Sequence, residues 1–218
     1  MAGQFTTDPI AFFTGVEADR AVELLRRYEG YTGAWFDRVA AISPPGTITP
    51  ADIAALTLLD VAAPRAAARE ITNPNGLSRK ITALLDQIKD DLSIWDNPES
   101  LTSGSGGWKL EALLRGLNGV GRTKASKLMA AKRPDLFPVY DRYVGEAMFD
   151  PKETNFWAPW VRYIEEGRGD ALRDAAVRAQ GASGASATVS PLRLVDIVVW
   201  MRQYGDPALQ GVPLGSRL

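Results

Sequence analysis

The 218-residue chain contains no cysteine and no histidine. Without cysteine it can form no disulfide, no thiolate zinc site and no iron–sulfur cluster. Without histidine it has no imidazole general base, no Ser–His or Cys–His nucleophile and no His-ligated metal. Chemistry is therefore left to carboxylates, lysines, tyrosines and backbone amides, and we expect neither a metal nor a cofactor.

Long hydrophobic runs are missing as well. The most apolar segment, LRLVDIVVWM, contains Arg193 and Asp196 and is far too short to span a membrane. The first residues, MAGQFTTDPIAFFTG, have neither a basic region nor a long apolar run, so they do not resemble a secretory signal. We therefore expect a soluble, cytoplasmic protein without a membrane partner.

The net charge is only −1, but the charge is unevenly distributed. Between Lys109 and Tyr143 there are eight basic residues and three acidic ones, which is a local net charge of +5. The remainder holds 17 basic and 23 acidic residues, which is a net charge of −6. One positive segment on an otherwise acidic protein is expected where a single face meets a polyanion. A solvated, lysine-rich helix face would produce the same count.

Helix signals recur along the chain and strand signals are weak. Thr49, Pro50 and Asp52 suit an N-cap, a first helical position and the positive end of a helix dipole. Ser190 and Pro191 start another predicted helix, whose apolar circumference indicates a central buried helix. We therefore predict an all-α, multi-helix fold.

The chain is predicted to form a single compact helical unit over residues 1–218. The glycine- and serine-rich stretch at 181–189 is interpreted as a surface linker, because the helix after it is too apolar to stand apart. Within the unit, residues 106–133 are interpreted as two helices joined by a glycine turn. Residues 134–149 are a connecting segment and a helix that carries Asp141.

The residues of the glycine turn LNGVG predict its conformation and an anion site beside it. Gly119 and Gly121 lack a Cβ, so they can take a positive φ and let another backbone approach closely. Val120 between them can point inward as a peg. The next helix begins near Arg122, and its unpaired amides make an anion site.

The segment LNGVGRTKASKLMAAKRPDLFPVYDRYV resembles the helix-hairpin-helix/Gly-Pro-Asp superfamily of DNA glycosylases, the endonuclease III-like proteins. In that family a hairpin of the form G-V-G-x-K-x-A is followed by P-x-x-V-D-x-x-V, which bears the catalytic aspartate. Laying LNGVGRTKA on the hairpin places Asp141 on this aspartate without an insertion. The resemblance implies a glycosylase-like helical fold and DNA as the partner. It implies DNA contacts from Gly119, Val120, Gly121, Arg122, Thr123, Lys124 and Lys127.

The chain departs from the family pattern in several places. Thr123 occupies the position of the lysine that attacks the sugar in bifunctional members, and Lys124 lies one residue, or about 100° of helix, further on. This argues against lyase activity and leaves a monofunctional hydrolase. The family's Asp-Thr-His reads Asp-Arg-Tyr from Asp141 onward, and Tyr140 stands where a small aliphatic residue is common. The chain therefore resembles a diverged branch, and the missing cysteines exclude the iron–sulfur cluster of some members.

Asp141 is the candidate catalytic carboxylate. Cleaving an N-glycosidic bond creates positive charge on the sugar, which a fixed carboxylate can stabilise while it orients the attacking water. The base must first leave the stack and enter a pocket lined by aromatic groups. Asp141 is equally suited to be the N-cap of the helix that follows it.

Other residues in this region have two interpretations each. Lys132 and Arg133 can contact phosphate, or they can end their helix as cations that favour its dipole. Candidates for base stacking are Tyr143, Trp108, Trp157 and Trp160, each of which can also be a core residue, whereas Trp35 and Trp200 are assigned to the core.

Three interpretations of the function follow. In the first, the chain is a DNA-binding protein that acts as a monofunctional DNA glycosylase through Asp141. In the alternative, it is a non-catalytic helix-hairpin-helix module that holds DNA or another phosphate-bearing partner, and Asp141 only caps. A third hypothesis keeps the hairpin for packing and gives the acidic remainder a protein partner.

Overall fold

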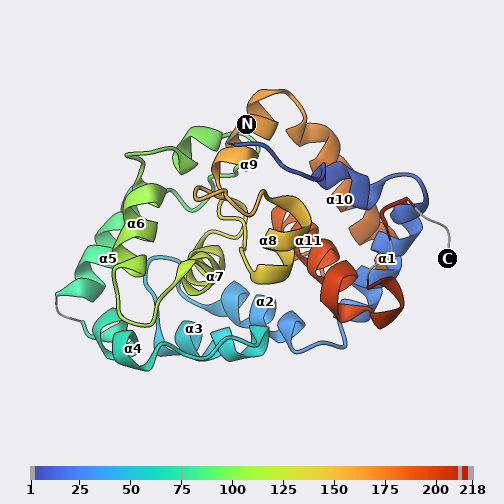
Figure 1. The fold of residues 1–218 in the computed structure, drawn as a ribbon. Helices are drawn as coiled ribbons and strands as arrows, with labels where there is room; N and C mark the ends of the chain where they lie inside the picture. The colour runs from blue at the N-terminus through green and yellow to red at the C-terminus, as the bar shows by residue number, and fades with distance from the viewer. Residues whose placement is uncertain (1–2, 75, 211–212, 216–218) are drawn as a thin grey trace. The chain divides into compact units, whose positions relative to one another are not determined.

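The computed structural model describes residues 3–74, 76–210 and 213–215 (Figure 1). Over these residues the chain is helical and contains no β-strand, which confirms the predicted all-α, multi-helix fold. Phe5 and Phe149 form an isolated antiparallel bridge. No helix in these ranges is both long and apolar enough to cross a membrane.

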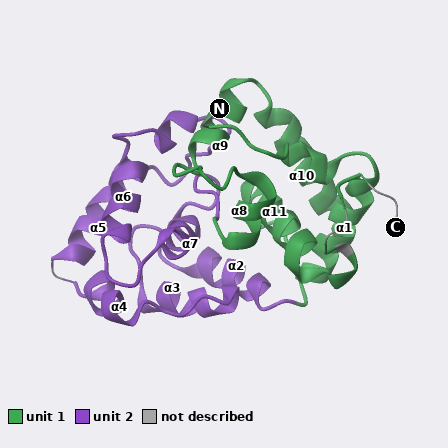
Figure 2. Ribbon diagram, viewed as in Figure 1, with its two compact units in different colours: residues 1–30, 140–218 green, residues 31–139 purple. Residues whose placement is uncertain are grey.

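The chain divides into two compact units, whereas the sequence predicted one (Figure 2). Unit 1 combines residues 1–30 with residues 140–218, and unit 2 comprises residues 31–139. The boundaries fall between Gly30 and Tyr31 and between Val139 and Tyr140, in connections between helices. The conspicuous glycine- and serine-rich stretch lies inside unit 1, so composition does not mark the division.

Unit 2 is built around α7. This helix contacts α2, α3, α6 and the 3-10 turn η2. Every residue from Ala125 to Lys132 is buried, although three of these eight residues are serine or lysine. The bounds in unit 2 are α2 Gly33–Ile42, α3 Pro50–Ala55, η2 Leu56–Leu59, α4 Arg65–Thr72, α5 Leu77–Gln87, η3 Pro98–Leu101, α6 Gly106–Arg115 and α7 Arg122–Lys132.

Unit 1 is built around α11, which contacts α1, α8, α10, η1 and η4. The residues from Leu192 to Val199 are all buried, which confirms the predicted central helix. Arg193 and Asp196 pair on this helix. The bounds in unit 1 are η1 Pro9–Phe13, α1 Val16–Tyr28, α8 Arg142–Met148, α9 Ala158–Glu165, α10 Gly169–Ser183, α11 Pro191–Trp200, the π-helical turn η4 Met201–Gly205 and η5 Pro207–Leu209.

The predicted surface linker is shorter than the sequence suggested. α10 continues to Ser183 and ends at Gly184, whose φ of +75° suits glycine. The connection that follows is held by the side chain of Gln180. Its amide donates to the Ser186 carbonyl oxygen at 2.7 Å and to that of Val189 at 3.0 Å. Four of the nine residues of the stretch at 181–189 are therefore helix or helix cap.

Candidate functional site

The hairpin is the turn between α6 and α7, and the fold makes different demands on its two glycines. Gly119 has a φ of +79°, in the left-handed region that favours glycine. Gly121 has a φ of −88° and a ψ of −176°, which any residue adopts. A Cβ on either glycine would meet nothing within 4 Å among the described residues. Val120 is 4% exposed, so its side chain points into the core as predicted. Its amide donates to the Leu117 carbonyl oxygen at 3.1 Å.

The start of α7 brings positive charge to this turn. Gly121 is the N-cap residue, and no side-chain hydrogen bond caps the helix there in the described chain. The Lys124 ammonium donates to the Gly119 carbonyl oxygen at 2.7 Å, which holds this cation against the turn. Arg122 and Thr123 complete the first helical turn, and both are half-buried. The positive end of the α7 dipole and a fixed ammonium therefore lie on the same turn.

Lys127 does not lie on this surface, which corrects its prediction as a phosphate contact. The residue is 3% exposed, and its ammonium donates to the Leu59 carbonyl oxygen of η2 at 3.2 Å. α7 is buried on nearly every side from Ala125 onward, so the side chain of Lys127 meets a neighbouring element of unit 2 rather than solvent.

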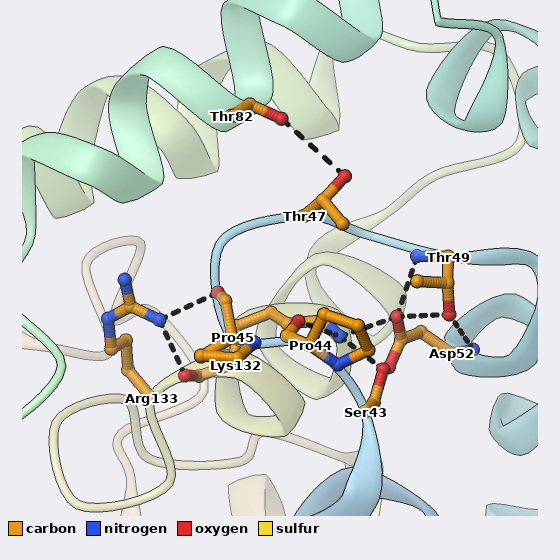
Figure 3. A network of polar contacts seen from close by, with 9 residues as sticks. All are labelled: Ser43, Pro44, Pro45, Thr47, Thr49, Asp52, Thr82, Lys132 and Arg133. Carbon is orange, nitrogen blue, oxygen red and sulfur yellow. Dashed lines mark hydrogen bonds and ion pairs between the residues drawn. The ribbon is translucent and has the colours of Figure 1, made fainter.

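Lys132 is buried and pairs with Asp52 of α3 (Figure 3). The distance from Lys132 Nζ to Asp52 Oδ2 is 2.5 Å, and both side chains are fully buried. The same ammonium donates to Ser43 Oγ at 2.7 Å and to the Pro44 carbonyl oxygen at 3.1 Å. Burial lowers the pKa of Lys132, and Asp52 opposes this effect. Asp52 also accepts from the Thr49 amide at 2.7 Å, which completes the cap predicted at the start of α3.

Arg133 is also internal. Its guanidinium donates to the carbonyl oxygens of Leu85 at 2.9 Å and Ile88 at 2.8 Å, at the end of α5. It also donates to the Pro45 carbonyl oxygen at 2.8 Å (Figure 3) and pairs with Asp90 at 2.6 Å. Burial lowers the pKa of Arg133, and the charge of Asp90 opposes it. Three of the eight cations in the basic segment are thus buried inside unit 2: Lys127, Lys132 and Arg133.

Asp141 lies in unit 1 and is the N-cap of α8. Its Oδ1 accepts from the Val144 amide at 3.0 Å, which confirms the capping role. The carboxylate is therefore held in one orientation, while its catalytic role stays a prediction. Tyr140, which departs from the family pattern, is accommodated by a glycine of α8. A Cβ on Gly145 would lie 2.7 Å from the Tyr140 hydroxyl oxygen.

The aromatic candidates for base stacking have different environments. Trp157 and Trp160 are 1% and 3% exposed and belong to the core of unit 1. Trp108 is half-buried on the first turn of α6, where its amide donates to Ser105 Oγ at 3.1 Å. Tyr143 is half-buried on the first turn of α8. Tyr143 and Trp108 are therefore the two candidates that are not fully buried.

The assignment of Trp35 to the core is wrong. Trp35 is 57% exposed, because Phe36, the next residue around α2, takes the buried position instead and is 2% exposed. Trp200 is only half-buried. Tyr204, which the sequence did not single out, is 45% exposed and stacks on Tyr143. It lies in a π-helical turn, where the 3.6-residue period no longer describes which side chains share a face.

The predicted residues fall into two groups. The turn residues Gly119–Lys124 belong to unit 2, and Asp141 and Tyr143 belong to unit 1. A family model described as a family of unknown function (DUF6308) matches residues 21–203, which is most of the chain and includes both groups. No curated protein and no solved structure matches the chain.

Proposed function

The chain belongs to the family of unknown function DUF6308, and we propose that it binds DNA with the hairpin between α6 and α7 against the phosphate backbone. The glycines of the turn support this proposal. The fold accounts for Gly119, whose φ is positive. It does not account for Gly121, whose φ any residue adopts and whose missing Cβ makes room for nothing in the described chain. A glycine that the fold does not need leaves the backbone open to close approach by another molecule.

The charge at the turn also supports an anionic ligand. A helix N-terminus attracts phosphate through its amides and its dipole. At α7 the N-cap residue is glycine, and the Lys124 ammonium is held beside the turn. Contacts of this kind position a protein on DNA without reading its sequence. The proposed binding is therefore salt-dependent and tolerant of sequence.

Reversing charge at the turn is expected to weaken DNA binding. Arg122→Glu and Lys124→Glu each replace a cation by an anion where a phosphate would lie, and each should lower duplex affinity at low salt by about tenfold or more. The slope of log affinity against log salt should become shallower by about one for each phosphate that the variant no longer neutralises. Fluorescence anisotropy with a labelled duplex over a salt series measures both quantities.

Lys80→Glu is the matched control for these variants. It makes the same change of charge at an exposed position of α5, in the same unit. Lys127→Glu would not be informative, because Lys127 is buried and its substitution would test folding. The proposal fails if the wild-type protein does not bind DNA at low salt. It also fails if Lys80→Glu weakens binding as much as Lys124→Glu, because binding then depends on total charge.

As a second candidate function we propose a monofunctional DNA glycosylase that uses Asp141. The hydrogen bond from the Val144 amide supports this candidate in that it holds one carboxylate oxygen in place, although it is also the bond by which Asp141 caps α8. A fixed carboxylate can stabilise the positive sugar and orient water during cleavage of an N-glycosidic bond. Thr123 at the position of the lyase lysine implies release of the base without strand cleavage. In the alternative, Asp141 caps α8 and the chain is a binding module.

The variant Asp141→Asn distinguishes the capping role of Asp141 from its proposed catalytic role. Asparagine caps a helix about as well as aspartate, so the variant should keep its stability and its DNA affinity. It loses the negative charge, so base release should fall by about 100-fold or more. Asp141→Ala should lose the product as well, together with about 0.5–2 kcal/mol of stability from the missing cap. The assay counts abasic sites in duplexes that carry a panel of damaged or modified bases.

The outcomes divide the two candidates. Product from the wild type and none from Asp141→Asn, with equal DNA affinity, supports catalysis. Equal product from both proteins removes Asp141 from the chemistry. DNA binding without product on any substrate leaves the binding module as the function.

A further inference from the structure

An aromatic stack lies on unit 1, where α8 contacts α11 and the turn η4. The ring centroids of Tyr143 and Tyr204 are 4.6 Å apart, and their planes are inclined by 27°. Trp200 packs against Tyr204 with a centroid distance of 5.3 Å. Tyr204 is nevertheless 45% exposed. The stack therefore lies at the surface of unit 1 and is not enclosed by the core.

The backbone that carries Tyr204 is unusual and fixed. η4 continues α11 as a π-helical turn, which the Asp206 amide closes by donating to the Met201 carbonyl oxygen at 2.8 Å. A Cβ on Gly205 would lie 2.6 Å from Met201 Sδ, so glycine lets the Met201 side chain pack against the turn. The Asp206 carboxylate pairs with Arg27 of α1 at 2.6 Å. π-helical turns are rare and frequently mark functional sites.

The charges beside the stack favour an uncharged ring over a free anion. The Arg142 guanidinium carbon lies 5.1 Å from the centroid of the Tyr143 ring. Arg142 also pairs with Glu146 at 3.3 Å, and both side chains are largely exposed. With Asp141, the helix start carries two carboxylates and one guanidinium. A free phosphate would meet net negative charge here, whereas a neutral planar ring gains stacking surface and one nearby cation.

We propose that Tyr143 and Tyr204 form a stacking platform for an unpaired nucleobase of bound DNA. Stacking on aromatic side chains is how proteins hold unpaired bases without reading their sequence, and arginine beside the ring adds to it. The ligand class rests on the DNA binding proposed above, but the platform is separate from the hairpin in sequence and in unit.

Three substitutions at Tyr204 test the platform. Tyr204→Phe keeps the ring, Tyr204→Leu keeps apolar bulk without a ring, and Tyr204→Ala removes both. Binding is measured by anisotropy on an intact duplex and on the same duplex with a short single-stranded gap. Tyr204→Leu and Tyr204→Ala should lose about fivefold or more in affinity for the gapped DNA, while Tyr204→Phe should bind it like the wild type. All three should bind the intact duplex equally well, which also shows that they are folded.

The two proposals fail in different ways. Equal affinity of wild type and Tyr204→Leu for gapped DNA, with duplex binding intact, overturns the platform alone. Gapped-DNA binding that depends on Tyr204 but is indifferent to Lys124→Glu supports the platform and overturns the hairpin contact. If the wild type binds neither DNA at low salt, both proposals are overturned.

Discussion

Lys132→Met is expected to destabilise the protein by about 3–5 kcal/mol, because it leaves a buried carboxylate without its cation. Methionine fills nearly the same volume, so the loss is mainly electrostatic. Asp52 would keep the Thr49 amide as a donor, but its Oδ1 already has no hydrogen-bond partner in the described part of the chain. Ser43 Oγ would lose its donor as well. Urea unfolding at neutral pH measures the loss.

Two further variants show where the effect of Lys132→Met comes from. Asp52→Asn combined with Lys132→Met removes both charges and keeps a residue that can cap α3, so it should lose less stability than Lys132→Met alone. Lys109→Met removes an exposed cation of α6 and should change stability by no more than about 0.5 kcal/mol. A loss below about 1 kcal/mol for Lys132→Met would contradict the importance of the pair.

The basic segment shows what a count of charges can and cannot predict. The local excess of cations is real, but the sequence does not say which of them face solvent. Lys132 meets Ser43, which lies 89 residues earlier, and Arg133 meets the end of α5. Such partners depend on tertiary packing, so no local sequence pattern predicts them. The proposed contact between the hairpin and DNA therefore depends on fewer cations than the sequence suggested.

The sequence could predict those features that depend only on residues close together in the chain. The cap at Thr49 and Asp52 and the cap at Asp141 each depend on a side chain and an amide three residues away. The π-helical turn at Tyr204 could not be predicted in this way. Gly205 in this turn packs against the Met201 side chain, a contact that depends on tertiary packing. The division into two units is likewise a property of tertiary packing and not of composition.

In unit 1 the corresponding buried pair joins Glu17 of α1 to Arg202 of η4. Arg202 Nε lies 3.1 Å from Glu17 Oε2, and both side chains are 2% exposed. Glu17 also accepts from Arg20 at 2.7 Å and from the Gly215 amide at 3.0 Å. Burial alone would raise the pKa of Glu17, but the hydrogen bonds and charges of these partners lower it below its ordinary value of 4.5.

Arg202→Met should therefore destabilise the protein by about 3–5 kcal/mol at neutral pH. In the wild type, the unfolded chain holds the Glu17 proton more tightly than the folded one, so this stability is present above pH 4.5 and is lost as the pH falls. In the variant, burial raises the pKa of Glu17 with less to oppose it, so acidification weakens the variant less than the wild type. The gap in unfolding free energy between variant and wild type should therefore narrow as the pH falls towards 4.5 and below it.

Urea unfolding at a series of pH values distinguishes this mechanism from a packing defect. Packing around Arg202 does not titrate, so a packing defect would leave the same gap between variant and wild type at every pH. Arg26→Met is the control, because Arg26 pairs with Glu23 on the same helix but both side chains are 55% exposed. Such a pair contributes less than about 1 kcal/mol, so its removal should hardly change stability. A pH-independent gap for Arg202→Met would show that the buried charge of Glu17 does not need its partner.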